Sequence, residues 1–254
     1  MTTTTLGLRR RLLLPAWQAA VVATAAGVHA SVPRELLDSS ADDPVPATGA
    51  VLAADRSPSA PAVATFGLAA GPARLLIRGG TAYRRRLTVL GLGGELGASL
   101  SRDLDAPEAV RPVEHSVFSI ELLAEELLRC LPEVPLDPSP RVGLRRADPA
   151  LLLAATSGHT SMTPGRVSAE APADVLSALA GRFDASLEVT AISDGPPLLV
   201  DRLVWFAADG QWWHARPDSD VHGAPVLDVL PVEPADLPRA VAPLLSGLLM
   251  AAQA

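Results

Sequence analysis

Lysine is missing from this 254-residue sequence, and all 21 basic residues are arginines. The 28 acidic residues outnumber them and leave a formal net charge of −7. A general attraction to nucleic acid or to anionic membranes therefore has no electrostatic support. The run Arg84-Arg85-Arg86 is a candidate phosphate contact, but in an acidic chain such a run is more often a solvated strand end. The all-arginine composition, rich in Ala, Pro and Gly, is typical of a GC-rich genome.

Cysteine occurs once, at position 130, so an internal disulfide is impossible. Cys130 follows Leu123 and Leu127 at helical spacing in the stretch ELLAEELLRCL. This spacing predicts a buried small hydrophobic residue rather than a nucleophile. The cysteine content thus indicates no need for an oxidising compartment.

Motifs that carry catalysis are also missing. The sequence has no G-x-S-x-G elbow, no H-E-x-x-H zinc helix, no P-loop and no paired cysteines. His159 stands among hydroxyl residues in SGHTS without an acidic partner nearby in the sequence, which indicates a solvated loop histidine. His214 and His222 have no third ligand residue near them and are a weak metal signal. We therefore expect a protein that is not an enzyme and that binds neither a metal nor a cofactor.

Residues 9–30, RRRLLLPAWQAAVVATAAGVHA, have two interpretations. Their basic start, apolar middle and small-residue end are typical of a secretory signal. Alternatively, they form an amphipathic helix in which Pro15 suits the first turn and Gly27 the end. The residues at helical spacing are Leu14, Trp17, Val21, Val22 and Ala25. Because Gln18 and Thr24 interrupt the apolar stretch, we favour the folded helix and a cytoplasmic location.

The two halves of the chain resemble one another on either side of a Pro-rich stretch at 132–149. Three pairs of segments correspond, at separations of 112, 116 and 112 residues: 73–80 with 185–192, 86–100 with 202–216, and 117–128 with 229–240. In this alignment Gly94 matches Gly210. The shared order predicts an internal duplication, with residues 1–131 as the first half, 132–149 as the linker and 150–254 as the second half of one compact domain.

Each half has the same expected order of elements: two helical segments, a block of short strands joined by tight turns, and a closing helix. The expected helices are about 14–26, 60–70 and 120–131 in the first half, and 148–156, 172–182 and 234–250 in the second. This order predicts an α+β fold of two pseudo-symmetric halves, with an antiparallel sheet and flanking helices.

The glycine-rich stretch LTVLGLGGELGASLSR, residues 87–102, offers an alternative function. A strand that runs into glycines between Gly91 and Gly97 resembles a dinucleotide-binding turn, with Glu121 as a candidate ribose-binding acid. Pro107 leaves little room for the helix that must follow such a turn. The duplication instead equates Gly93-Gly94 with Asp209-Gly210, a strong hairpin signal. A dinucleotide-binding oxidoreductase therefore remains the alternative.

The hairpin and the segment EHSVFSIELLAEELLRCLPEV, residues 114–134, resemble the EspG family of ESX (type VII) secretion-associated proteins. The likeness consists of a duplicated chain, an N-terminal helix with a tryptophan, a hairpin with a glycine turn, and S-V-F before an acidic helix that ends at L-P. It extends diffusely over residues 14–250, and the Pro/Ala-rich segment 39–61 departs from it.

The EspG resemblance implies a pseudo-twofold α+β fold and the function of a cytosolic chaperone. Such a protein binds the apolar tip of secreted helical hairpins of the PE/PPE type and keeps them soluble before export. A structural or oligomerising protein without a client is a third possibility. The sequence does not identify the client.

Aromatic residues make up only 4% of the chain, yet three of its four tryptophans lie in RLVWFAADGQWWHAR, residues 202–216. A two-residue turn at Asp209-Gly210 pairs Ala208 with Gln211, Ala207 with Trp212, Phe206 with Trp213, and Trp205 with His214. Strand alternation then places Leu203, Trp205 and Trp212 on one face, which we expect in the core. Phe206, Trp213 and Val204 share the other face. They are either covered by helices or form the apolar patch that binds a partner.

Overall fold

The computed structural model describes most of the chain. The described residues are 9–37, 57–81, 83–105, 111–137, 145–147, 184–194, 199–208, 210–219 and 225–251. The helices expected at 148–156 and 172–182 lie outside them, as do His159 and His222.

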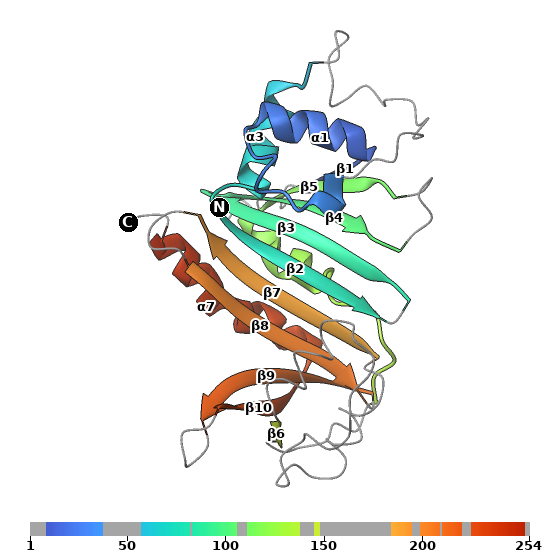
Figure 1. Ribbon diagram of the computed structural model, residues 1–254, viewed down its shortest axis with the longest axis vertical. Helices are drawn as coiled ribbons and strands as arrows, with labels where there is room; N and C mark the ends of the chain where they lie inside the picture. The colour runs from blue at the N-terminus through green and yellow to red at the C-terminus, as the bar shows by residue number, and fades with distance from the viewer. Residues whose placement is uncertain are drawn as a thin grey trace, which may run out of the picture.

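Ten strands of the described chain form one antiparallel sheet (Figure 1). They are β1 (Arg9–Leu14), β2 (Ala73–Thr81), β3 (Arg85–Gly93), β4 (Leu96–Asp103), β5 (Val113–Ser119), β6 (Arg145–Ala147), β7 (Ala185–Ser193), β8 (Leu199–Ala208), β9 (Gln211–Ser219) and β10 (Pro225–Val232). From edge to edge their order is β1-β5-β4-β3-β2-β7-β8-β9-β10-β6. The expected combination of helices with an antiparallel sheet is confirmed.

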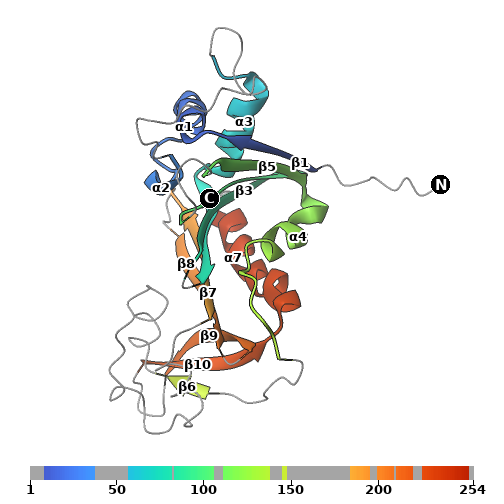
Figure 2. The same ribbon diagram turned by 90° about the vertical axis from the view of Figure 1, so that its right-hand side faces the viewer.

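Helices cover both sides of this sheet (Figure 2). On one side lie α1 (Ala16–Ala25), α2 (Arg34–Leu37) and α3 (Ala60–Ala69). On the other lie α4 (Leu123–Leu128), which follows the 3-10 helix η2 (Ile120–Leu122), and α7 (Leu237–Ala251), which follows η4 (Pro234–Asp236). We call the two sides the α1–α3 face and the α7 face.

Successive side chains of a strand point to opposite faces of the sheet, so each face has its own hydrophobic core. The α1–α3 face buries Leu76, Leu87, Val89, Ala98 and Leu100. The α7 face buries Leu75, Ile77, Leu90, Leu187 and Trp205. The sheet is therefore the middle layer of the molecule, and its strands are apolar on both sides where helices cover them.

Helix α1 confirms the expected helix near the N-terminus, but its buried side agrees with the expected apolar stripe only in part. Val22 of that stripe is buried, together with Ala16, Ala19 and Ala23, whereas Val21 is exposed. The expected Leu14 belongs to β1 instead. Alanines are favoured on the inner side because α1 packs directly against α3, and small side chains allow a close approach. Gly27 ends the helix with a φ of +71°, as expected.

Residues 9–14, the basic start of the signal-like stretch, form edge strand β1 and pair with β5 from Arg9↔Phe118 to Leu14↔Val113. Leu14 is buried in the core beneath α1. In the structure, then, this stretch is folded as part of the sheet and its covering layer. Among the described residues, no helix is both long and apolar enough to cross a membrane.

Strands β3 and β4 form an antiparallel hairpin whose turn is Gly94-Glu95, because Gly93 pairs with Leu96. The expected turn at Gly93-Gly94 was wrong by one residue. Gly94 has a φ of +60°, which glycine adopts without steric cost. Gly91 serves a different purpose, since a Cβ atom there would lie 1.8 Å from the backbone oxygen of Leu68. Its missing side chain lets the end of α3 rest on β3.

The closing helices occur where expected, although α4 is shorter than the segment 120–131. In α7 the buried residues Leu237, Val241, Leu244 and Leu248 recur every three or four positions and form one apolar stripe against β7 and β8. A capping box of Glu233 and Asp236 stabilises the start of η4.

The segment expected as a linker, 132–149, contains β6, which pairs with β10. Just before β6, the backbone N–H of Asp137 donates a hydrogen bond of 2.6 Å to the carbonyl oxygen of Gly210 in the β8–β9 turn. The segment therefore contributes contacts of its own to the second half of the sheet.

Candidate functional site

The β8–β9 hairpin has the pairing expected from its sequence. Ala208 lies opposite Gln211, Phe206 opposite Trp213, and Trp205 opposite His214. Gly210 in the turn has a φ of +73°. The hairpin register predicted from the Asp-Gly turn is thus confirmed.

On the α7 face of the hairpin, Trp205 and Trp212 are buried together with Leu203. The two tryptophan rings have their centroids 6.4 Å apart, and His214 lies 6.1 Å from Trp205. Burial, with a smaller effect of the Arg216 charge, lowers the pKa of His214 to about 4. The expectation that Leu203, Trp205 and Trp212 belong to the core is confirmed.

The candidate partner-binding residues Phe206, Trp213 and Val204 lie on the opposite side of the hairpin, the α1–α3 face. Phe206 is 1% and Trp213 5% exposed, and Val204 is half-buried. The Trp213 Nε1–H donates to the carbonyl oxygen of Ala208 at 3.4 Å. In this conformation the two rings offer a partner almost no area, so Val204 is the accessible member of the three.

Val204 belongs to a row of side chains that crosses the middle of the sheet. Its neighbour on β7 is Glu188, whose neighbour on β2 is Arg78. The adjacent row consists of Arg202, Thr190 and Leu76 in the same order. The α1–α3 face between the two halves therefore carries charged residues of both signs beside apolar ones.

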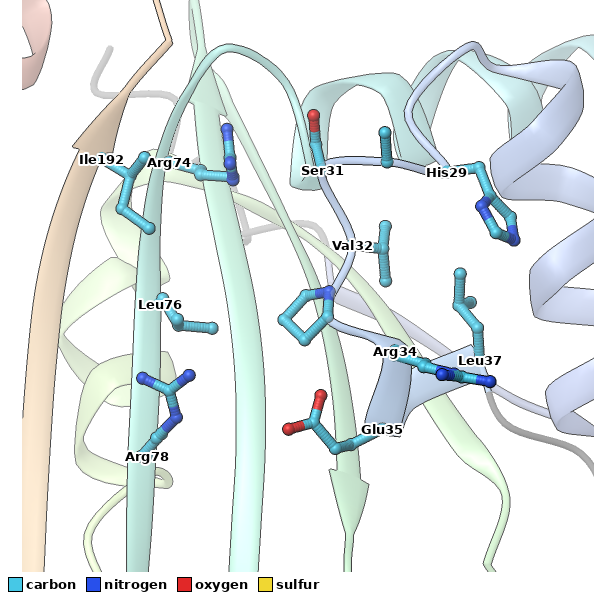
Figure 3. Close-up of a pocket in the computed structure, with 12 residues that line it drawn as sticks. His29, Ser31, Val32, Arg34, Glu35, Leu37, Arg74, Leu76, Arg78 and Ile192 are labelled. Carbon is cyan, nitrogen blue, oxygen red and sulfur yellow. The ribbon is translucent and has the colours of Figure 1, made fainter. Parts of the chain in front are cut away.

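These rows lead into a cleft of about 690 Å³ between β2 and the chain that enters α2 (Figure 3). We call it the α2 cleft. Its walls are residues 29–35 and Leu37 on one side, and Arg74, Leu76, Arg78 and Ile192 on the other. A cleft of this size is in the range of ligand-binding pockets.

Two arginines of the cleft differ in how they are held. Arg74 donates to the carbonyl oxygen of Gly71 at 3.0 Å and to the Asp194 carboxylate at 2.5 and 3.3 Å. Arg78, by contrast, makes no hydrogen bond within the described chain and lies 4.0 Å from Glu188. Glu188 already receives Arg202 at 3.2 Å and the Thr190 hydroxyl at 3.2 Å. Arg78 therefore keeps unused donors at the rim of the cleft.

The three arginines of the run 84–86 form ion pairs with carboxylates. Arg84 pairs with Asp103, Arg85 with Asp105, and Arg86 with both Asp103 and Glu114. The hydrogen bond from Arg85 lowers the pKa of Asp105. The run 84–86 is thus a paired strand end, in agreement with the structural interpretation of the sequence.

Helix α4 is joined to the sheet by a charged network around Glu126. This carboxylate is 3% exposed and has Arg9, Arg11 and Arg129 as ion-pair partners at 4.0, 3.4 and 2.9 Å. Ser99 donates a hydrogen bond to it at 3.2 Å. Nearby, burial alone would raise the pKa of Glu114, but the hydrogen bonds and charges of its arginine partners outweigh burial and lower it.

The features that suggested chemistry have structural roles in the described chain. The stretch Gly91–Gly97 belongs to the antiparallel β3–β4 hairpin, so the strand does not lead into a helix as a dinucleotide-binding turn requires. Cys130 is buried as expected, and burial raises the pKa of its thiol to about 11. Among the described residues, no cluster of His, Cys, Asp and Glu could hold a metal ion.

Comparison with protein-family models finds no match for this chain, and neither does comparison with curated proteins. The arrangement of the strands and the geometry of the α2 cleft are therefore the basis for assigning a function. Sequence reasoning identified Val204 but missed Arg78 and the α2 cleft, because the cleft is formed by three separate parts of the chain, residues 29–37, residues 74–78 and Ile192.

Proposed function

We propose that this protein is a cytoplasmic chaperone or adaptor of a type VII (ESX) secretion system, similar to the EspG family. In this role it binds the apolar tip of a helical secreted substrate of the PE/PPE kind before export. The observation that carries the proposal is the order and register of the strands, which agree with the duplicated α+β fold that the resemblance implies.

The strand order supports two pseudo-symmetric halves. From the centre outward, the strands of the first half are β2-β3-β4-β5-β1, and those of the second are β7-β8-β9-β10-β6. Each strand of the first half thus lies at the same distance from the centre as the strand of the second half whose number is five higher. Both halves then continue into a 3-10 helix and an α-helix, η2-α4 and η4-α7.

The register at the centre supports the same interpretation. Ile77 of β2 pairs with Val189 of β7, and these residues are 112 positions apart, the separation of the two strands in the alignment of the halves. A twofold axis through this pair would bring each strand onto the other. A twofold axis perpendicular to the sheet brings one strand onto an equivalent neighbour when the two strands are antiparallel, as β2 and β7 are.

The next strands correct the alignment by one residue. Leu75 pairs with Leu90, and its counterpart Leu187 pairs with Trp205. Leu90 therefore corresponds to Trp205 at a separation of 115 residues, not 116. A shift of one residue changes the face of every side chain. Phe206 then corresponds to Gly91, on the face that α3 covers in the first half.

The proposal is tested by capture from the native host. Tagged protein should retain a small helical type VII substrate in near-stoichiometric amount, identified by mass spectrometry. Val204→Arg, at a half-buried position on the α1–α3 face, should reduce the captured amount at least about tenfold without unfolding the protein. Leu13→Arg is the matched control, since Leu13 is exposed on β1 at the far edge of the sheet. Capture of no type VII substrate by the wild-type protein would contradict the proposal.

A further inference from the structure

We propose that the α2 cleft is a docking site for a peptide segment in which an acidic side chain neighbours an apolar one. This inference rests on the proposed function for the source of the segment, a secreted client. Its chemistry follows from the cleft itself.

The apolar part of the cleft consists of Val32 and Pro33 on one wall and Leu76 and Ile192 on the other. Leu76 and Val32 are already packed into the core of the α1–α3 face. These apolar residues are therefore already packed, and an aliphatic side chain of a partner can be buried against them without opening the fold. Such burial contributes about 25 cal/mol for each Å² of apolar surface removed from water.

The charged part of the cleft favours an acidic partner. Arg34, Arg74 and Arg78 line it together with a single acidic residue, Glu35, although the whole chain has a net charge of −7. Arg74 is held by Asp194, so Arg78 is the arginine to which we assign the recognition of a carboxylate. Arg78 is 51% exposed and lies 4.0 Å from Oε1 of Glu188, the oxygen that also receives Arg202 and Thr190, so its guanidinium keeps donors that make no hydrogen bond within the described chain. A carboxylate can accept two parallel hydrogen bonds from such a guanidinium, which adds both affinity and orientation.

Glu35 lies on the wall opposite Arg78 and directs its carboxylate toward the cleft (Figure 3). Within the described chain this carboxylate has no ion-pair or hydrogen-bond partner, whereas the backbone oxygen of Glu35 accepts from Arg102 at 3.1 Å. A negative charge here repels the acidic group of a partner from the α2 wall. It thereby directs that group to Arg78.

The segment does not dock as an added strand. The backbone of β2 is paired on both sides, with β3 and with β7. Recognition in the cleft must therefore come from side chains, and for this reason we assign specificity to the combination of one apolar and one acidic residue.

The test is an NMR titration of ¹⁵N-labelled full-length protein with two capped peptides, acetyl-GDLDG-amide and its neutral counterpart acetyl-GNLNG-amide. The acidic peptide should bind at least about fivefold more tightly. Its largest shift changes should fall on the amides of residues 29–37 and 74–78. Arg78→Gln should abolish the preference for the acidic peptide, and Glu35→Gln should keep or increase it.

Arg84→Gln is the matched control, because Arg84 is also an exposed arginine of this sheet but is paired with Asp103. This variant should retain the full preference. Equal binding of the two peptides by the wild-type protein, no binding at all, or shift changes away from the cleft would each overturn the docking site.

The peptide titration tests the docking site and the capture experiment tests the proposed function, so either can be contradicted without the other. A protein that prefers the acidic peptide in the cleft but captures no type VII substrate supports the docking site and contradicts the proposed function. A protein that captures such a substrate but treats both peptides alike supports the function and overturns the docking site.

Discussion

The rings of His115 and Phe66 lie against each other in the core of the α1–α3 face, with centroids 4.7 Å apart and planes inclined by 55°. Within the described residues, neither ring nitrogen of His115 has a hydrogen-bond partner. Burial, with a smaller effect of the Arg10 charge, lowers the pKa of His115 to about 4.

The burial of His115 makes the stability of the protein depend on pH. In the unfolded chain a histidine titrates near pH 6.5, so the unfolded state takes up a proton that the folded state resists. The free energy of unfolding should therefore fall as the pH drops below about 6.5, by roughly 3 kcal/mol near pH 4. Urea unfolding at several pH values measures this loss, which His115→Leu should reduce.

His214 should contribute to the same pH dependence, because burial also lowers its pKa to about 4. A variant at His214 is therefore the control for that experiment. The single variant His115→Leu should keep a weaker slope of the same sign, and combination with His214→Gln should flatten it further. An unchanged slope in His115→Leu would show that His115 is not buried as a neutral ring.

Loss of the Glu126 carboxylate should destabilise the attachment of α4. Glu126→Ala would leave Arg9, Arg11 and Arg129 without this buried partner. Because the three arginines are partly exposed and keep Glu125 or Glu114, the loss should be about 2–3 kcal/mol, below the roughly 3–5 kcal/mol of a fully buried pair. Glu125→Ala is the matched control, since Glu125 is 62% exposed and its ion-pair partner in the described chain is Arg9. It should cost less than about 1 kcal/mol. Chemical unfolding of both variants decides the comparison, and similar losses would contradict it.

The two neighbouring tryptophans of β9 should both be needed for stability. Truncation of Trp212, which packs against Trp205, should cost about 3–5 kcal/mol. Trp213 is buried on the other face, so Trp213→Ala should also lower the melting temperature by several degrees. Tyr83→Ala, at a ring that is 84% exposed, provides the control in calorimetry. A Trp213→Ala protein as stable as the wild type would mean that this ring is free to bind a partner.

Two glycines of the β3–β4 hairpin should respond differently to alanine. Gly91→Ala places a methyl group against the Leu68 carbonyl and should displace α3, at a cost of about 3 kcal/mol or more. At Gly94 there is open space, and the cost of about 1–2 kcal/mol comes from the positive φ alone. Thermal unfolding of the two variants ranks them, and the reverse ranking would refute the close packing of α3 on β3.

Much of the fold follows from local sequence signals. The dipeptide Asp209-Gly210 predicted a two-residue hairpin turn, and the alternation of residues around it agreed with the register of that turn. These two signals together predicted the β8–β9 pairing. In the β3–β4 hairpin, either of the adjacent residues Gly93 and Gly94 suits the first position of the turn. The pairing of Gly93 with Leu96 places Gly94 there. The inward side of α1 was missed for a similar reason, since contact with α3 favours alanine over the larger Val21.

The candidate site was less accessible from the sequence. Val204 could be placed on a face by counting along a strand. The free donors of Arg78 could not be foreseen, because they depend on how β2, β7 and β8 place Arg78, Glu188 and Arg202 beside one another. Such a property emerges only when three strands from both halves are side by side.

The central pairing of β2 with β7 also has a kinetic consequence. It joins segments more than 100 residues apart, so closing it costs chain entropy that only the finished contact repays. Until it forms, each half exposes the edge of a strand that is central in the native sheet. The newly made chain is then most vulnerable to aggregation at that edge, and this late step should limit the rate at which the protein reaches its native state.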